Sequence, residues 1–341
     1  MMIQVAYVLT SNGKDIYADM NLISLRSLRY SNPQAKIILA CDTDTIQCLE
    51  TCQHSILKEA DQIISIETPS QSAGFRNRFI KTSLRQYISG DFLYLDADTV
   101  IRGDLTPIFI IQADFAAAPN HSGSGDPSEM PSDERENFEL LNWKIPEQYY
   151  VNGGVLFFAD TPEIHQFSQI WHQKWLASAA KRGSFRDQPS LNSAINDSEV
   201  NFVWLPHKFN AQIDVRPIHV KGAIIWHLYS SNGRITMRTT FDQYISLLQE
   251  GKNITFKQIQ KLCQRYHPWS VENPVDYWVV QKLLSQPQFI NSTCFERLWM
   301  SRHYQQATDI WLNENAKCFM KILSLLLRLK LKIISIKSKI T

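Results

Sequence analysis

Two aspartates, Asp96 and Asp98, stand one residue apart directly after the apolar run Phe-Leu-Tyr-Leu at 92–95. A short apolar run that ends in polar residues is typical of a buried strand, and ligands of open α/β sheets bind beyond the carboxyl ends of strands. Because only Ala97 separates the two aspartates, both carboxylates can face one point beyond the strand. Hard anionic oxygens suit Mg²⁺ or Mn²⁺. The pair therefore predicts a divalent metal site that serves a phosphate-bearing ligand.

The elements that would position this pair alternate between strands and helices. We expect strands at 3–10, 36–41, 62–66 and 92–95, with helices at 17–30, 43–52 and 75–87 between them. The helix at 17–30 would bury a face that includes Tyr17. Further strands are expected at 114–118, 155–158, 200–205 and 224–228, with helices beginning at Thr161 and near Asp187. This alternation predicts an α/β fold with a parallel sheet and helices on both faces.

Residues 119–149 are rich in Ser, Pro, Gly, Asp and Glu, which predicts a long loop that acts as a lid or binding loop. From about residue 241 the pattern turns helical. We therefore divide the chain into an α/β domain at 1–240 that holds the site, a helical appendage at 241–316 and a tail at 317–341.

Composition argues against several classes of protein. Seven of the 35 Lys and Arg residues lie in 317–341, which leaves 28 basic residues against all 33 acidic residues in the rest of the chain. A body of this charge does not suit nucleic acid as a partner. The N-terminus lacks the features of a signal peptide, and the cysteine spacing fits no zinc site. We expect the six cysteines to be reduced and mostly buried, as in a cytoplasmic protein.

Several short motifs, taken in order, resemble glycosyltransferase family 8, the retaining enzymes that include glycogenin and bacterial lipopolysaccharide galactosyltransferases. The resemblance covers about residues 3–230. The motifs that carry it are Val8-Leu-Thr-Ser11 with Tyr17, Leu95-Asp-Ala-Asp98, Asn152-Gly-Gly-Val155, Asp187-Gln-Pro-Ser-Leu-Asn192, Leu205-Pro206 with Phe209-Asn210, and His227. The resemblance implies a GT-A fold, with a mixed Rossmann-like sheet over residues 1–240, and transfer of a sugar from a nucleotide sugar.

By this resemblance Asp96, Asp98 and His227 hold Mn²⁺ together with the donor diphosphate. An imidazole beside two carboxylates favours Mn²⁺ over Mg²⁺, and the metal neutralises the charge that develops on the leaving diphosphate. His227 alone could equally be a core histidine. Lys81 matches a basic residue that touches the donor, and family habit implies uridine as the base.

The remaining site residues also come from the resemblance. Thr10 and Ser11 are expected to contact the base and ribose, and Tyr17 could stack on the base. Asn152, Gly153 and Gly154 would let the backbone approach the sugar, because glycine lacks a side chain. Asp187 and Gln188 match the sugar-binding and catalytic positions, although Asp187 could instead cap a helix. The sequence leaves open whether retention uses a covalent carboxylate intermediate or a same-face route in which the leaving phosphate accepts the proton of the acceptor.

The chain departs from the family after His227, where members often have a Gly and a Lys that contact the diphosphate. Here the run is Leu-Tyr-Ser-Ser-Asn-Gly233-Arg234, so either Arg234 or Arg238 substitutes for that lysine or the chain belongs to a different subfamily.

The tail at 317–341, drawn as a helix with ~100° per residue, gathers most of its basic residues in one stripe opposite leucines and isoleucines. Such a helix is typical of a peripheral anchor on an anionic membrane, although it could also pack on the acidic body of the protein. An anchor would suit a carbohydrate or glycolipid acceptor, as in lipopolysaccharide or glycan biosynthesis.

Two other functions remain open. Asp96-Ala-Asp98-Thr-Val100 also fits a haloacid-dehalogenase-type phosphatase, in which the first aspartate attacks phosphate, but there the motif usually lies on the first strand. A degenerate GT-A domain could act as a membrane-associated interaction module. A sugar nucleotidyltransferase fits less well, because the first turn lacks a Gly-rich basic loop.

Overall fold

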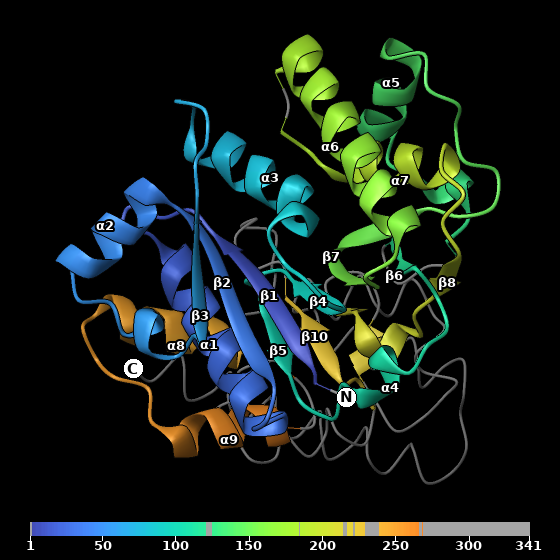
Figure 1. Cartoon of the computed structure of the whole chain (residues 1–341). Coiled ribbons are helices and arrows are strands. Elements are labelled where there is room, and N and C mark those ends of the chain that lie inside the picture. The colour runs from blue at the N-terminus through green and yellow to red at the C-terminus, as the bar shows by residue number, and fades with distance from the viewer. Residues whose placement is uncertain are drawn as a thin grey trace, which may run out of the picture.

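The computed structural model describes residues 2–120, 125–183, 185–213, 217–220, 222–228, 239–265 and 268. Its centre is a seven-stranded sheet in the order β3-β2-β1-β4-β7-β6-β8 (Figure 1). The strands are β1 (Gln4–Leu9), β2 (Lys36–Asp42), β3 (Gln62–Ile66), β4 (Phe92–Leu95), β6 (Phe115–Pro119), β7 (Val151–Phe158) and β8 (Phe202–Trp204). Strands β1 to β4 pair in parallel, but β7 runs antiparallel to both β4 and β6. β8 pairs in parallel with β6, so the sheet is mixed and only β7 departs from the parallel direction predicted by the alternation.

Helices cover both faces of this sheet, as predicted. Along β1, Val5 and Tyr7 pack in the apolar cluster beneath α1 (Ile16–Ser31) and α2 (Thr43–Thr51). Ala6 and Val8 point to the opposite face, which is the alternation expected of a strand. That face packs against α3 (Ala73–Ser83), α6 (Pro162–Arg182) and α7 (Gln188–Asn196). The remaining short helix on the first face is α4 (Thr106–Phe109).

A second, three-stranded sheet has the order β5-β10-β9. It brings together the predicted metal ligands, which come from two distant parts of the chain. It consists of β5 (Thr99–Ile101), β10 (Ile225–His227) and β9 (Ala211–Gln212). β10 runs antiparallel to β5, and its register sets His227 opposite Thr99. This pairing brings the end of β10 next to the Asp96–Asp98 turn.

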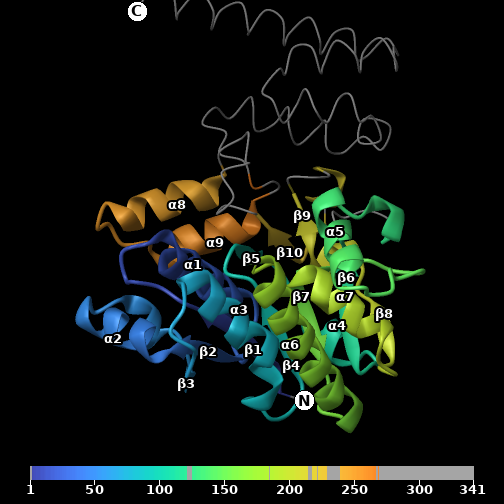
Figure 2. The same ribbon diagram turned by 90° about the horizontal axis from the view of Figure 1, so that it is seen from above.

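Helices α8 (Thr240–Gln249) and α9 (Phe256–Gln264) lie beside α1 (Figure 2). Phe241 of α8 and Leu262 of α9 share one apolar cluster with Ile23 of α1 and Trp226 of β10. The division of the chain at residues 240 and 316 stays a prediction.

Residues 119–149 are not simply a loop. They contain a 3-10 turn over Pro127–Glu129 and a helix, α5 (Ser132–Leu140), which buries Glu134, Asn137 and Phe138. The many polar residues of α5 hide its short buried face in the sequence. β7 also begins earlier than predicted, so Asn152 to Gly154 lie inside a strand.

The prediction that Tyr17 lies on a buried helix face was wrong. Tyr17 is 45% exposed and does not belong to the buried face of α1. Of the four cysteines in the described ranges, all free, only Cys41 and Cys263 are buried.

Within the described ranges, no helix combines the length and apolar character needed to cross a membrane.

Asn192 fastens α7 to the start of β7. Its side chain is fully buried, its Oδ1 accepts from the Val151 N–H at 2.7 Å, and its Nδ2 donates to the Val151 carbonyl at 3.1 Å. Asn192→Ala should lower the free energy of unfolding by roughly 2–4 kcal/mol, because it leaves both backbone groups of Val151 buried without these partners. Chemical denaturation measures this loss. Asn196→Ala on the same helix removes only a local contact to Asp197 and serves as control; an equal loss in both variants would contradict this role of Asn192.

Candidate active site

The three predicted metal ligands converge. One ligand atom each from Asp96, Asp98 and His227 lie within 4.8 Å of one another. The Nε2 atom of His227 is 3.3 Å from Asp98 Oδ1 and 3.8 Å from Asp96 Oδ2. Asp98 and His227 are buried, and Asp96 is half-buried. His227 is thus not a solitary core histidine, because its ring faces two carboxylates.

Backbone pairing fixes this geometry. β4 ends at Leu95, and the Asp96 N–H then donates to the Gly154 carbonyl of β7 at 2.9 Å. On the other side, the Leu228 N–H donates to the Asp98 carbonyl at 2.8 Å. The Asp96–Asp98 turn is therefore held between the two sheets.

The two carboxylate oxygens of Asp96 have different neighbours. Oδ1 accepts a hydrogen bond from the Tyr94 hydroxyl and from Lys81 Nζ, the latter at 3.3 Å, whereas Oδ2 faces His227. Burial alone would raise the pKa of Asp96, but the charges of Lys81, His227 and Arg78 outweigh it and lower the pKa to about 2. Asp96 is therefore ionised at neutral pH, with Oδ2 turned toward the other two ligands.

A chain of amides orients His227. Its Nδ1 lies 3.0 Å from Asn210 Oδ1, and Asn210 Nδ2 donates to Asn152 Oδ1 at 2.9 Å. In this arrangement Nδ1 carries a proton, because the Asn210 oxygen can only accept, and Nε2 is the nitrogen that faces the carboxylates and would bind the metal in its deprotonated form. Metal-binding histidines are usually oriented by such a partner. Two carboxylates and an imidazole nitrogen so arranged fit Mn²⁺.

Electrostatics couple His227 to the same carboxylates. Burial lowers the pKa of His227, but Asp98 and then Asp96 raise it by more, so the pKa lies above its ordinary value.

Lys81 joins Asp96 to Asp187. Its ammonium group is buried and lies 2.8 Å from Asp187 Oδ2, while Arg78 Nε lies 2.9 Å from Asp187 Oδ1. Asp187 occupies the N-cap position of α7 but makes no capping hydrogen bond with its side chain, so the capping interpretation was wrong. Arg76, which lies on α3 with Arg78 and Lys81, pairs with Asp42 rather than with Asp187.

Gly153 and Gly154 permit a close approach. A Cβ atom on Gly154 would lie 2.2 Å from His227 Cε1 and 2.8 Å from Asp96 Oδ2, so no side chain fits there. The Gly153 N–H donates to Gln188 Oε1 at 3.2 Å, which brings α7 to β7 at the site.

The predicted base and ribose contacts lie at the end of β1. The Thr10 hydroxyl donates to the Ala73 carbonyl at 3.0 Å, and the Ser11 hydroxyl donates to Asp15 at 2.9 Å. Both hydroxyls therefore have partners within the protein, whereas the Tyr17 ring is exposed. Their roles toward a nucleotide stay predictions.

Sequence reasoning missed several polar residues at the site. Asn210 orients His227, although it lies within a motif that carried the resemblance. Tyr94, which contacts Asp96, was assigned to the apolar strand. Glu134 comes from the predicted loop and accepts a hydrogen bond from Gln188 Nε2 at 3.0 Å. Gly233, Arg234, Arg238 and the tail at 317–341 lie outside the described residues.

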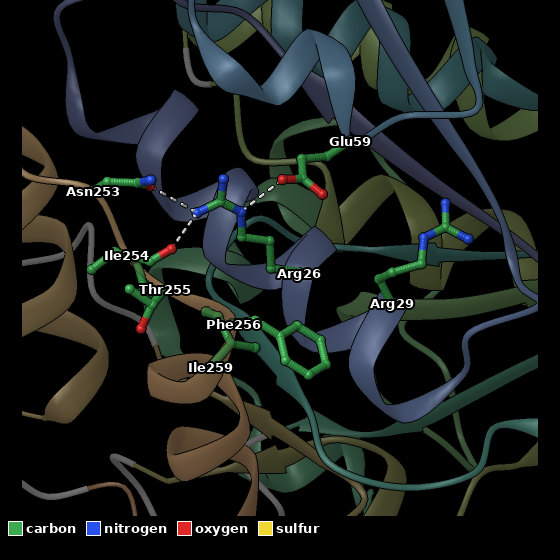
Figure 3. A pocket seen from close by; sticks show the side chains of 8 residues that line it. All are labelled: Arg26, Arg29, Glu59, Asn253, Ile254, Thr255, Phe256 and Ile259. Carbon is green, nitrogen blue, oxygen red and sulfur yellow. Dashed lines mark hydrogen bonds and ion pairs between the residues drawn. The ribbon is translucent and has the colours of Figure 1, made fainter.

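A separate pocket lies between α1 and α9 and shares no residue with the carboxylate cluster (Figure 3). Arg26 lines it but already donates to Glu59 and to the Ile254 carbonyl, each at 2.8 Å. Arg29 donates to Asp61 and to the Ala35 carbonyl. Because both guanidinium groups are engaged, this pocket is a poorer candidate for an anionic ligand.

The glycosyltransferase family 8 model matches residues 17–243. The chain belongs to this family. It is a glycosyltransferase with the GT-A fold. The phosphatase and interaction-module alternatives are therefore set aside.

Similar solved structures include the galactosyltransferase LgtC in complex with donor and acceptor sugar analogues (14% identity, TM-score 0.48, 74% of this chain and 97% of that chain). Another is the glycosyltransferase GlyE of Streptococcus pneumoniae (18%, 0.48, 80% and 66%). A third is mouse xyloside xylosyltransferase 1 (13%, 0.45, 68% and 99%). At these values the likenesses add nothing to the family assignment. No curated protein matches the sequence.

Gly154→Ala should weaken Mn²⁺ binding by at least about 10-fold, because the methyl group must displace His227 or Asp96. Titration of Mn²⁺ by calorimetry measures the change. Gly74→Ala is the matched control, since a Cβ there would meet its nearest neighbour, Phe185, at an ordinary 3.5 Å. Wild-type Mn²⁺ affinity in Gly154→Ala would show that the cluster is not the metal site.

Proposed function

We propose that this protein is a metal-dependent, retaining glycosyltransferase that moves a sugar from a UDP-sugar to a glycan or lipid-linked acceptor. The observation that carries the proposal is the convergence of Asp96, Asp98 and His227 within 4.8 Å in a family 8 domain. Mn²⁺ bound by these residues would act as a Lewis acid toward the leaving diphosphate.

The charge balance of the site supports metal dependence. The carboxylates of Asp96, Asp98 and Asp187 are accompanied by two contacting cations, Lys81 and Arg78. Both cations are engaged by Asp187, so they neutralise carboxylates within the site. With His227 neutral, as metal binding requires, the three carboxylates outnumber these two cations, so a diphosphate would meet net negative charge there, and like charges repel. A divalent cation reverses this balance, so nucleotide and metal should bind together.

The environment of Asp187 favours the same-face route to retention. Its Oδ1 pairs with Arg78 and its Oδ2 with Lys81. A carboxylate whose oxygens are both held by cations is a poor nucleophile, and the neighbouring amide of Gln188 is a poorer one. In the proposed mechanism Asp187 and Gln188 hold and orient the donor sugar, and the proton of the acceptor hydroxyl passes to the leaving phosphate.

Calorimetry of UDP binding tests the metal dependence. UDP should bind wild-type protein with Mn²⁺ and bind poorly in EDTA. Asp98→Asn removes a proposed metal ligand, so the metal affinity should fall by more than the roughly 10–100-fold that loss of an outer-shell partner costs. The enhancement of UDP binding by Mn²⁺ should be lost as well. Asp104→Asn, an exposed residue after β5, is the control. Equally tight UDP binding with and without metal would contradict the proposal. A screen of nucleotide sugars for Mn²⁺-dependent hydrolysis would then identify the donor.

The lipid-linked acceptor and the peripheral membrane location rest on the composition of residues 317–341. Deletion of these residues should release the protein from vesicles that contain anionic lipid, because about 1 kcal/mol of attraction per basic residue is lost. Co-sedimentation at low and high salt measures the change. Equal sedimentation of full-length and truncated chains would contradict the membrane anchor without affecting the metal site.

A further inference from the structure

The side-chain amide of Gln188 is held at both ends. Its Oε1 accepts from the Gly153 N–H at 3.2 Å and from Asn152 Nδ2 at 3.4 Å. Its Nε2 donates to Glu134 Oε2 at 3.0 Å. The two ends therefore contact different elements, β7 on one side and α5 on the other.

These contacts define one orientation of the amide. A backbone N–H can only donate, and an ionised carboxylate can only accept. If the amide turned by 180°, its NH₂ group would face the Gly153 N–H and its oxygen would face Glu134. Both contacts would then be repulsive, so Glu134 and Gly153 together exclude the turned state.

Glu134 is itself fixed. The carboxylate is buried, accepts a hydrogen bond from the Tyr150 hydroxyl, and has Arg186 4.0 Å from its other oxygen. Burial raises the pKa of Glu134 by more than the hydrogen bonds from Tyr150 and Gln188 and the charge of Arg186 lower it, so the pKa lies above its ordinary value. These donors hold the Glu134 carboxylate in one position at the site. Its helix, α5, nevertheless belongs to a segment whose sequence resembles that of a surface loop.

We propose that Glu134 is a positioning residue, which sets the orientation of the Gln188 amide and thereby presents its oxygen on the β7 side of the site. This inference rests on the proposed function, in which Gln188 orients the donor sugar. It also gives the 119–149 segment a role in the chemical step. Changes in α5 should therefore alter the rate of transfer.

A double-mutant cycle separates this role from simple packing. Initial rates of Mn²⁺-dependent hydrolysis of UDP-galactose and UDP-glucose are compared for wild type, Glu134→Gln, Gln188→Ala and the double variant. Glu134→Gln should lower kcat by roughly 10–100-fold, as small misplacements of catalytic groups do, with KM little changed. In the Gln188→Ala background the same substitution should have no further effect. Glu136→Gln, an exposed residue on the same helix that pairs with Arg182, should behave as wild type.

A second readout does not depend on turnover. The side-chain ¹H–¹⁵N signals of Gln188 are assigned by their absence in Gln188→Ala. In Glu134→Gln they should shift and lose protection from solvent exchange, while in Glu136→Gln they should not change. Melting temperatures confirm that each variant is folded, and Glu134→Asp, which keeps the charge but shortens the side chain, replaces Glu134→Gln if that variant does not fold.

The outcomes are distinguishable. Unchanged Gln188 signals in Glu134→Gln, or an effect of Glu134→Gln that persists in full without Gln188, would overturn the positioning role. A wild-type rate in Gln188→Ala would instead refute the role of Gln188 in the proposed function. If neither UDP-sugar is hydrolysed, the resonance measurement alone decides for or against the contact.

Discussion

The site depends on the confinement of three carboxylates in a small and mostly buried space. Asp96 and Asp98 lie on one turn and Asp187 lies at the start of α7, and the repulsion between their carboxylates would push these two segments apart. Lys81 opposes this repulsion by contacting both Asp96 and Asp187 from a buried position. Removing one partner of a buried ion pair typically costs roughly 3–5 kcal/mol. Lys81 is thus as important for assembling the site as for any contact with a donor.

The two sheets supply the opposing scaffold. The larger sheet positions Asp96 directly after β4 and the two glycines within β7, and the smaller sheet positions His227 at the end of β10. The absence of a side chain at Gly154 lets these strands approach until His227 faces the aspartates. The amide chain through Asn210 and Asn152 then sets the ring orientation. The proposed metal ligands and the residues proposed to face the donor are therefore parts of one hydrogen-bonded network.

Much of this arrangement could be predicted from the sequence. The apolar strand before Asp96, the helix starts at Thr161 and Asp187, and helices on both faces follow from local patterns. The long-range pairing of β10 with β5 could not, because three-residue strands carry almost no periodicity. The convergence of His227 with Asp96 and Asp98 was expected only through the family resemblance. The alternation of strands and helices in the sequence likewise does not reveal that β7 runs antiparallel to its neighbours.

Polar side chains with partners far away in the sequence were the hardest to predict. Glu134 lies among many charged residues, and nothing in its neighbours indicates that it is the buried one. Asn210 and Tyr94 act through hydrogen bonds that only the folded structure reveals. Tyr17 illustrates the opposite error, because its helical spacing fits a buried face while its position at the first turn of α1 leaves it exposed.

Anomalous diffraction from crystals grown with MnCl₂ and UDP tests directly whether Asp96, Asp98 and His227 hold the metal together with the diphosphate. We expect one strong manganese peak bounded by Asp96 Oδ2, Asp98 Oδ1 and His227 Nε2, with the diphosphate completing its coordination. A peak at another place, or ordered UDP at this site without a manganese peak, would contradict this expectation.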